Sequence, residues 1–278
     1  MIIKSDLHIH SEFSYDATLP LEVICERSRE LGFKKIGITD HLNYNDTQFI
    51  GDLTASAAAV KKMQEKYPFV LLGVELTPIE LPEFEYAAAH GTRDGYIPPK
   101  SDTPYPIELG MTKEELMRLG VRYGIGASHW RVDIAGGKKL RDDLYPSMKE
   151  WYRQQLYLAT DERVTILGHP WYNGKGLWYE DFSIIPRSMN EEIAAALKEN
   201  GKYAECNRCM FDSPKASERF KHQYAEFLRE LFERGIKITY GSDSHNAYNP
   251  KISEVEKHLS YAGFKSGDLV ELADEDLW

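Results

Sequence analysis

Short apolar runs alternate along the chain with longer stretches in which apolar residues recur every three or four positions. The short runs are typical of buried strands, and the longer stretches are typical of amphipathic helices. The clearest helix runs from about Lys215 to Arg234, where an apolar stripe that includes Phe220 and Leu231 ends at Gly235. The pattern predicts seven strands, at about residues 2–8, 35–41, 69–75, 122–129, 164–169, 203–207 and 237–243.

The order of these elements favours parallel strands. Helices are predicted between them, at about residues 20–31, 54–66, 145–159, 190–199 and 215–234. Repeated strand–helix units imply right-handed crossovers, in an open doubly wound sheet or in a barrel. Metal-type side chains end every predicted strand but the sixth, and a barrel gathers all strand ends around one mouth. We therefore predict an α/β fold, a TIM-like (β/α)7 barrel with its site at the C-terminal face of the strands.

One segment interrupts this alternation. Residues 76–109 contain six prolines and are too long for a plain connection between a strand and a helix. We expect one domain over residues 1–278, in which the insertion at about 76–109 lies over the barrel mouth as a lid or specificity loop. Within the insertion, Glu83 to His90 is expected to form a short hairpin. His90 itself is interpreted as structural, and the alternative is a general acid that reaches the site.

Composition restricts the class of protein. The 278 residues are 42% hydrophobic and 28% charged, as in an ordinary globular chain. No run approaches the roughly 18 apolar residues of a membrane helix, no signal peptide is recognised, and three cysteines argue against a disulfide framework. We expect a cytoplasmic protein without membrane contact. The net charge of −10 and the lack of a Lys/Arg-rich stripe favour a small phosphorylated partner over long nucleic acid, and leave the oligomeric state undetermined.

The candidate chemistry is concentrated at the strand ends. Alternate side chains of an extended strand point the same way, so His8 and His10 face one site, and Asp243 and His245 repeat this spacing near the other end of the chain. A lone buried histidine is more often a core residue than a ligand, but six histidines at strand ends are not explained in that way. The candidate metal ligands are His8, His10, Asp16, His41, Glu75, His129, His169, Asp243 and His245.

This set of ligands suits a cluster rather than a single ion. Imidazole and carboxylate together suit zinc, manganese or iron, and the lack of cysteine among them argues against a closed structural zinc site. Nine ligands exceed what one metal can use, so two to three divalent ions that share carboxylates are expected. A water that bridges two such ions loses its proton near neutral pH and becomes a nucleophile.

Six short motifs contain these ligands, in order along the chain. They are Asp6-Leu7-His8-Ile9-His10-Ser11 with Asp16, Thr39-Asp40-His41, Gly73-Val74-Glu75, Ser128-His129, Gly168-His169-Pro170 and Gly241-Ser242-Asp243-Ser244-His245. As a set they resemble the polymerase and histidinol phosphatase (PHP) family, and the resemblance spans nearly the whole chain. It implies a distorted seven-stranded barrel, a trinuclear metal site and hydrolysis of a phosphate ester.

The resemblance also implies how the ligands are shared. One ion would be held by His8, His10, Glu75 and Asp243. Glu75 would bridge to a second ion, which is bound also by His129 and His169. The third ion would be held by Asp16, His41 and His245.

Three further residues are candidates for catalysis or substrate contact. Asp40 is adjacent to His41 and is expected either to orient that imidazole or to cap the strand end. Arg131 and Arg208 follow predicted strand ends and are candidate clamps for a phosphate or a carboxylate. The alternative for each arginine is a solvated surface charge.

The resulting prediction is hydrolysis of a small phosphomonoester, in the manner of a histidinol phosphatase, by a metal-bridging hydroxide. A PHP-type nuclease or nucleotide phosphoesterase is the alternative. An amidohydrolase also starts with His-x-His but typically bridges its metals with a carboxylated lysine, and no predicted strand ends in lysine. A metal-dependent binding module is a further alternative. His222 and His258 fall within helices and are interpreted as ordinary positions.

Overall fold

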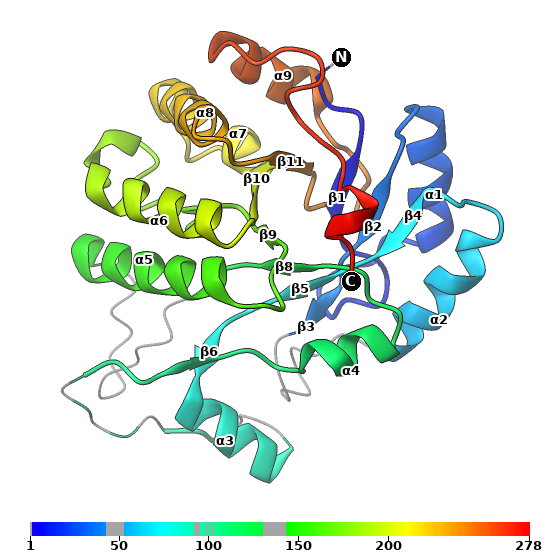
Figure 1. Ribbon diagram of the computed structural model, residues 1–278, viewed down its shortest axis with the longest axis horizontal. Coiled ribbons are helices and arrows are strands. Elements are labelled where there is room, and N and C mark those ends of the chain that lie inside the picture. The colour runs from blue at the N-terminus through cyan, green and yellow to red at the C-terminus, as the bar shows by residue number, and fades with distance from the viewer. Residues whose placement is uncertain are drawn as a thin grey trace.

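The computed structural model describes residues 2–42, 53–91, 95–97, 99, 101, 103–129 and 143–278, and Figure 1 shows strands surrounded by helices. The predicted strands at 35–41 and 69–75 are each split into two short strands, because residues 36–38 and 70–72 pair in one sheet and residues 41–42 and 74–76 pair in the other. The parallel strands are β1 (Asp6–Ile9), β2 (Ile36–Ile38), β3 (His41–Leu42), β4 (Val70–Leu72), β5 (Val74–Leu76), β8 (Gly124–Gly126), β9 (Ile166–Leu167), β10 (Tyr203–Asn207) and β11 (Ile238–Gly241).

These strands follow one another around a ring. One sheet has the order β1–β2–β4, and the other has the order β11–β10–β9–β8–β5–β3. The ends of the two sheets meet at β1 and β11, through a parallel bridge between Ile9 and Ser244 and a hydrogen bond from the Asp243 N–H to the His8 carbonyl oxygen. Within the described residues, the pairing therefore passes through seven strand positions, with an isolated bridge rather than a full ladder at this seam.

Helices cover the outside of the ring. The apolar stripe predicted near residues 215–234 forms one face of helix α8 (Glu218–Glu233). Phe220 and Leu231 on this face are buried in the layer between helices and strands. Ser217 caps its start by accepting a hydrogen bond from the Phe220 N–H. No helix in the described ranges is long and apolar enough to cross a bilayer. The helices of this layer are α1 (Leu21–Glu30), α2 (Leu53–Gln64), α4 (Lys113–Arg118), α5 (Leu144–Thr160), α6 (Arg187–Glu199), α7 (Cys209–Asp212), α8 (Glu218–Glu233) and α9 (Ile252–Tyr261).

A separate apolar cluster fills the interior of the ring. Tyr123, just before β8, is fully buried, and its hydroxyl donates to the Leu7 carbonyl oxygen at 2.7 Å. Two glycines make room for the aromatic ring of Tyr123. A Cβ atom at Gly37 would lie 1.6 Å from the Tyr123 hydroxyl oxygen, and one at Gly73 would lie 2.6 Å from its Cζ atom.

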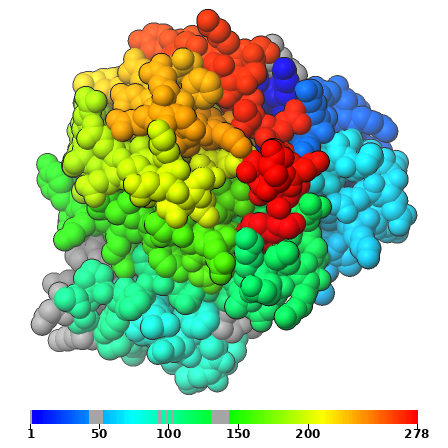
Figure 2. Space-filling model, in the orientation of Figure 1, coloured from blue at the N-terminus to red at the C-terminus, as the bar shows by residue number. Residues whose placement is uncertain are grey.

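The C-terminal segment closes the end of the ring where the strands begin. Leu272 is buried in the same cluster as Tyr123, and the Trp278 N–H donates to the Arg122 carbonyl oxygen at 2.8 Å. In Figure 2 these last residues, in red, pack among segments from both halves of the chain. The opposite end, where the strands finish, is the end at which barrel enzymes place their sites.

The excursion between β5 and β8 corrects one prediction. Its ends pair antiparallel as β6 (Ile79–Glu80) and β7 (Ile107–Glu108), and Leu81–His90 forms helix α3 instead of the predicted hairpin from Glu83 to His90. Pro82 stands in the first turn, and Gly91 ends the helix with a positive φ of 72°. The hairpin prediction was wrong because proline at a helix start and glycine at its end favour a helix. A position over the barrel mouth stays a prediction.

Candidate metal centre

Glu75 on β5 lies at the centre of the strand-end side chains. It is fully buried, although a carboxylate avoids burial unless it is paired or binds a cation. Its two oxygen atoms lie within 3.4 Å of nitrogen atoms on five of the described histidines, namely His8, His10, His41, His129 and His169.

Two more carboxylates join the remaining predicted ligands to this centre. An oxygen of Asp243 lies 3.3 Å from His10 Nε2 and 3.6 Å from His245 Nδ1. An oxygen of Asp16 lies 3.4 Å from His41 Nε2 and 3.5 Å from His245 Nε2. The structure therefore brings all of the predicted ligands together in one connected cluster, although they come from segments far apart in the sequence.

Backbone turns after two strands aim their ligands inward. His169 and Asp243 each follow the end of a strand by two positions and have positive φ angles of 23° and 52°. Residues with side chains adopt this region rarely. Such strained positions persist where surrounding contacts hold them, and they concentrate at functional sites.

The contact atoms fit a metal better than they fit one another. His41 Nδ1 and Glu75 Oε2 are 2.7 Å apart, yet neither atom has a hydrogen-bond partner in the described part of the chain. The same holds for the buried His169 Nδ1. Buried polar atoms are normally hydrogen-bonded, and lone pairs that converge on one point are the arrangement that a cation requires. The donor set of nitrogen and oxygen atoms suits divalent ions such as zinc.

The charges of the ionised carboxylates in the cluster also favour a bound cation. Burial, together with the charges of His41 and His245, lowers the pKa of His10 to about 3, so this imidazole is neutral. Burial works against ionised Glu75, but neighbouring histidines, His129 foremost, hold its pKa well below the usual range. Although burial opposes the charged form of His41, the negative charge of Glu75 raises the pKa of His41 to about 10, so this ring must release a proton when it binds an ion. The ionised carboxylates create a negative potential that a divalent cation would neutralise.

One supporting residue was missed from the sequence. Glu205 on β10 is 1% exposed; its Oε1 lies 2.7 Å from His8 Nδ1, and its Oε2 accepts from the His169 N–H at 2.6 Å. Such a carboxylate fixes the orientation and tautomer of a ligand histidine. A signal was present, because Glu205 and Asn207 share one face of the predicted sixth strand. Gly241 leaves the space, since a Cβ there would lie 1.9 Å from Glu205 Oε1.

Asp40 makes its hydrogen bonds away from the imidazole of His41. Its carboxylate accepts from the Ser11 N–H at 2.6 Å, from the Ser11 hydroxyl at 2.8 Å and from the Ser56 hydroxyl at 2.6 Å. These bonds fasten the loop after β1 to helix α2. Asp40 thereby holds in place the residue next to His10.

Arg208 borders the cluster at the end of β10. Its guanidinium donates to the carbonyl oxygens of Asn249 and Asp243, at 3.1 and 3.4 Å. It therefore braces the backbone that carries the ligand Asp243. Arg131, the other predicted clamp, lies outside the described residues.

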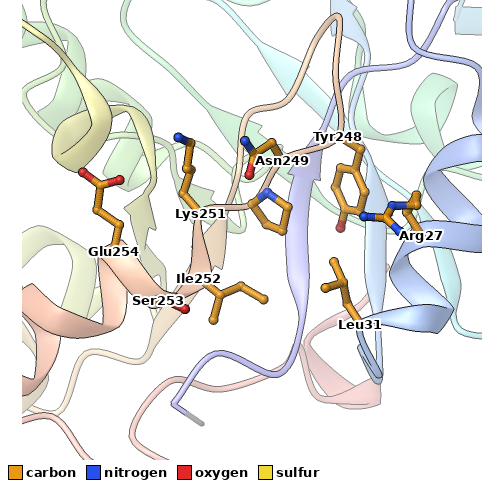
Figure 3. A pocket seen from close by; sticks show the side chains of 9 residues that line it. Arg27, Leu31, Tyr248, Asn249, Lys251, Ile252, Ser253 and Glu254 are labelled. Carbon is orange, nitrogen blue, oxygen red and sulfur yellow. The ribbon is translucent and has the colours of Figure 1, made fainter.

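A groove on the outer wall is separate from the cluster (Figure 3). It has a volume of about 800 Å³ and lies between Arg27 of α1, with Leu31 just after this helix, and the residues that lead into α9, including Lys251. Tyr248 on its wall donates to Asp6 Oδ2 at 3.1 Å. None of the residues that line it is a predicted site residue. The candidate site is therefore the strand-end cluster and not this groove.

A parallel α/β ring with a buried histidine–carboxylate cluster at its strand ends defines a barrel protein with a candidate metal centre. The model of the PHP domain family matches residues 6–209, so the chain belongs to the PHP family. A protein of Acetivibrio thermocellus described as a probable phosphatase is 41% identical over 58 residues. That match covers 21% of this chain and 23% of the relative.

A solved structure supports the fold over the full length. Histidinol phosphate phosphatase from Lactococcus lactis, in complex with zinc, L-histidinol and phosphate, aligns with 99% of this chain and 98% of its own, at a TM-score of 0.69 and 21% identity. This likeness confirms the predicted α/β, TIM-like architecture. The barrel is distorted in two places: two of its strands are split, and β1 and β11 share an isolated bridge in place of a ladder.

Proposed function

We propose that this protein is a metal-dependent phosphoesterase that hydrolyses a small phosphomonoester, in the manner of a histidinol phosphatase. One observation carries the proposal. The fully buried carboxylate of Glu75 lies within 3.4 Å of five described histidines, and a carboxylate in that position can be shared between two ions.

We propose two to three divalent ions, of zinc, manganese or iron. Three overlapping groups support this number, because within each group one ligand atom per residue lies within 4.8 Å of the others. These groups are His8 with His10 and Asp243, His41 with Glu75 and His129, and His10 with His41 and His245. The family resemblance places Asp16 beside His41 and His245, and the contacts of Asp16 with both support that assignment.

When bound, such ions polarise phosphoryl oxygens and lower the pKa of water enough to provide a nucleophile near neutral pH. The chain's own part is to hold the ligands in a fixed, dry arrangement. His8 and His10 are fully buried, and Glu205 fixes the ring of His8. Their positions are therefore set before a substrate arrives, which is the requirement for electrostatic stabilisation.

We assign positioning roles to two of the predicted catalytic residues. Arg208 holds the carbonyl group of Asp243, and Asp40 holds the loop after β1. Arg131 remains the candidate for direct contact with phosphate.

Charge and likeness both favour a phosphate monoester. Two or three neighbouring divalent ions would concentrate positive charge at the strand ends, which suits a dianionic phosphate. The similar Lactococcus lactis structure was solved with L-histidinol and phosphate, so histidinol phosphate is the first compound to test. We propose a small phosphorylated molecule as the partner and the cytoplasm as the compartment.

Phosphate release tests the proposal. Histidinol phosphate, nucleoside monophosphates and short oligonucleotides would be compared with Mn²⁺ or Zn²⁺ present. His10→Ala removes a buried ligand and should lower kcat/KM by about 100-fold or more, since even a partner of a ligand is worth 10–100-fold. His222→Ala, on α8 and outside the strand-end cluster, is the control and should retain activity. Equal phosphate release by His10→Ala and the wild type would refute the proposal and point to a contaminant.

A further inference from the structure

A second group of metal-type side chains lies outside the strand-end cluster, between α8 and α9, which pack side by side (Figure 1). Glu218 and His222 are four residues apart on α8 and therefore share one face. His258 approaches them from α9. One ligand atom from each of the three residues lies within 4.8 Å of the other two.

His258 is the buried member of this group. It is 2% exposed, and its ring stacks on Phe211 with the ring centres 5.4 Å apart. Its Nδ1 atom is buried and has no hydrogen-bond partner among the described residues, which is unfavourable unless something binds there. Burial lowers the pKa of His258, so the ring is held in the neutral form that binds metals.

The other two members can adjust to an ion. His222 stacks on Tyr261, with ring centres 4.0 Å apart, and Glu218 is exposed. Tetrahedral zinc with bonds of about 2.1 Å places its ligand atoms about 3.4 Å apart. The three ligand atoms lie within 4.8 Å of one another, so binding of an ion would draw them closer together. Lys221 and Lys257, at 3.0 and 4.0 Å from its oxygens, compete with a cation and weaken its binding.

We propose that Glu218, His222 and His258 form a further site for one divalent cation of the zinc class. Two imidazoles and one carboxylate suit zinc, cobalt or nickel over magnesium or calcium. The ion would link α8 to α9, the helix that follows the segment bearing Asp243 and His245. The proposal is independent of the hydrolytic activity, because it shares no residue with the Glu75 cluster.

Metal counting on the untagged, full-length protein tests the proposal. Chelator-stripped protein would be titrated with Zn²⁺ against a chromophoric chelator, and bound zinc would be counted by elemental analysis. His222→Ala should bind about one equivalent less than the wild type. His90→Ala is the matched control, because His90 is also a helical histidine stacked on a tyrosine, Tyr86, with ring centres 4.0 Å apart. The His90→Ala variant should bind as much zinc as the wild type.

A second variant separates loss of a ligand from loss of folding. Glu218→Gln keeps the size of an exposed side chain and should weaken the same equivalent at least tenfold, with the thermal midpoint of the stripped protein unchanged. Phosphatase activity of His222→Ala should equal that of the wild type. Full zinc occupancy in His222→Ala, or the same loss in His90→Ala, would overturn the proposal and indicate adventitious binding to surface histidines.

Discussion

Replacing Glu205 by glutamine should move the proton of His8 from Nδ1 to Nε2 and so lower the affinity of the cluster for metal. To hold an ion, the His8 ring would donate from Nδ1 to Glu205 Oε1, 2.7 Å away, and offer the lone pair of Nε2, which lies 3.3 Å from Glu75 Oε1. Oε2 meanwhile accepts from the His169 N–H and from Asn207 Nδ2. In the variant those two donors retain the amide oxygen, and the amide NH₂ group turns to His8. The His8 ring must then accept at Nδ1 and carry its proton on Nε2, where a ligand needs a lone pair.

The magnitude follows from the buried setting. All three donors point at a carboxylate that is 1% exposed, so solvent does not replace a lost bond. Loss of a carboxylate partner behind a ligand histidine costs about 10–100-fold in metal affinity. That range corresponds to about 1.4–2.7 kcal/mol. Folding of the metal-free chain should change less, because glutamine has the same shape, keeps two of the three hydrogen bonds and reverses the direction of the third.

Zinc or manganese affinity would be measured by competition with a chelator of known affinity, followed by phosphatase assays at saturating metal. Glu150→Gln is the matched control, because Glu150 on α5 is also a buried carboxylate, 4% exposed, that pairs with Arg153 away from the cluster. Metal affinity in Glu205→Gln within about twofold of the wild type would refute the tautomer argument.

Three other predictions concern stability. Gly37→Ala should lower the free energy of unfolding, measured in urea, by about 1–3 kcal/mol, because its Cβ would lie 1.6 Å from the Tyr123 hydroxyl oxygen. Adding Tyr123→Leu should recover part of this loss, and strictly additive losses in the double variant would contradict this account. Asp161→Asn should cost about 1–2 kcal/mol at neutral pH. Although burial raises the pKa of Asp161, hydrogen bonds from Arg163 hold it below 3.8, so the contribution is present above pH 3.8 and is lost as pH falls through the lowered pKa; a gap to the wild type that persists at lower pH would contradict this. Chelation should lower the thermal midpoint by several degrees in calorimetry, because ions bind only the folded state, and an unchanged midpoint would argue against a metal centre.

The local pattern of the chain was enough to predict the ring and its ligands. Strands and helices follow from apolar periodicity, which depends on neighbours in the sequence. The ligands could be found because they stand at strand ends, and parallel strands bring their ends to one face. His8 and His10 show this most directly, since alternation along one strand already places both on the same side.

Contacts between distant segments depend on packing that no local pattern contains. Glu205 stands in the predicted strand that ends without a candidate ligand. Its partner His8 lies 197 positions away in the sequence, and the two side chains meet only when β1 and β11 close the ring. The predicted hairpin is instead helix α3, for which the sequence did contain the local signals, Pro82 at the start and Gly91 at the end. His222 and His258 looked ordinary, since each is one polar residue on its own helix. The sequence by itself determined which elements form and which side chains end them, and the tertiary structure decided which of those side chains share a site.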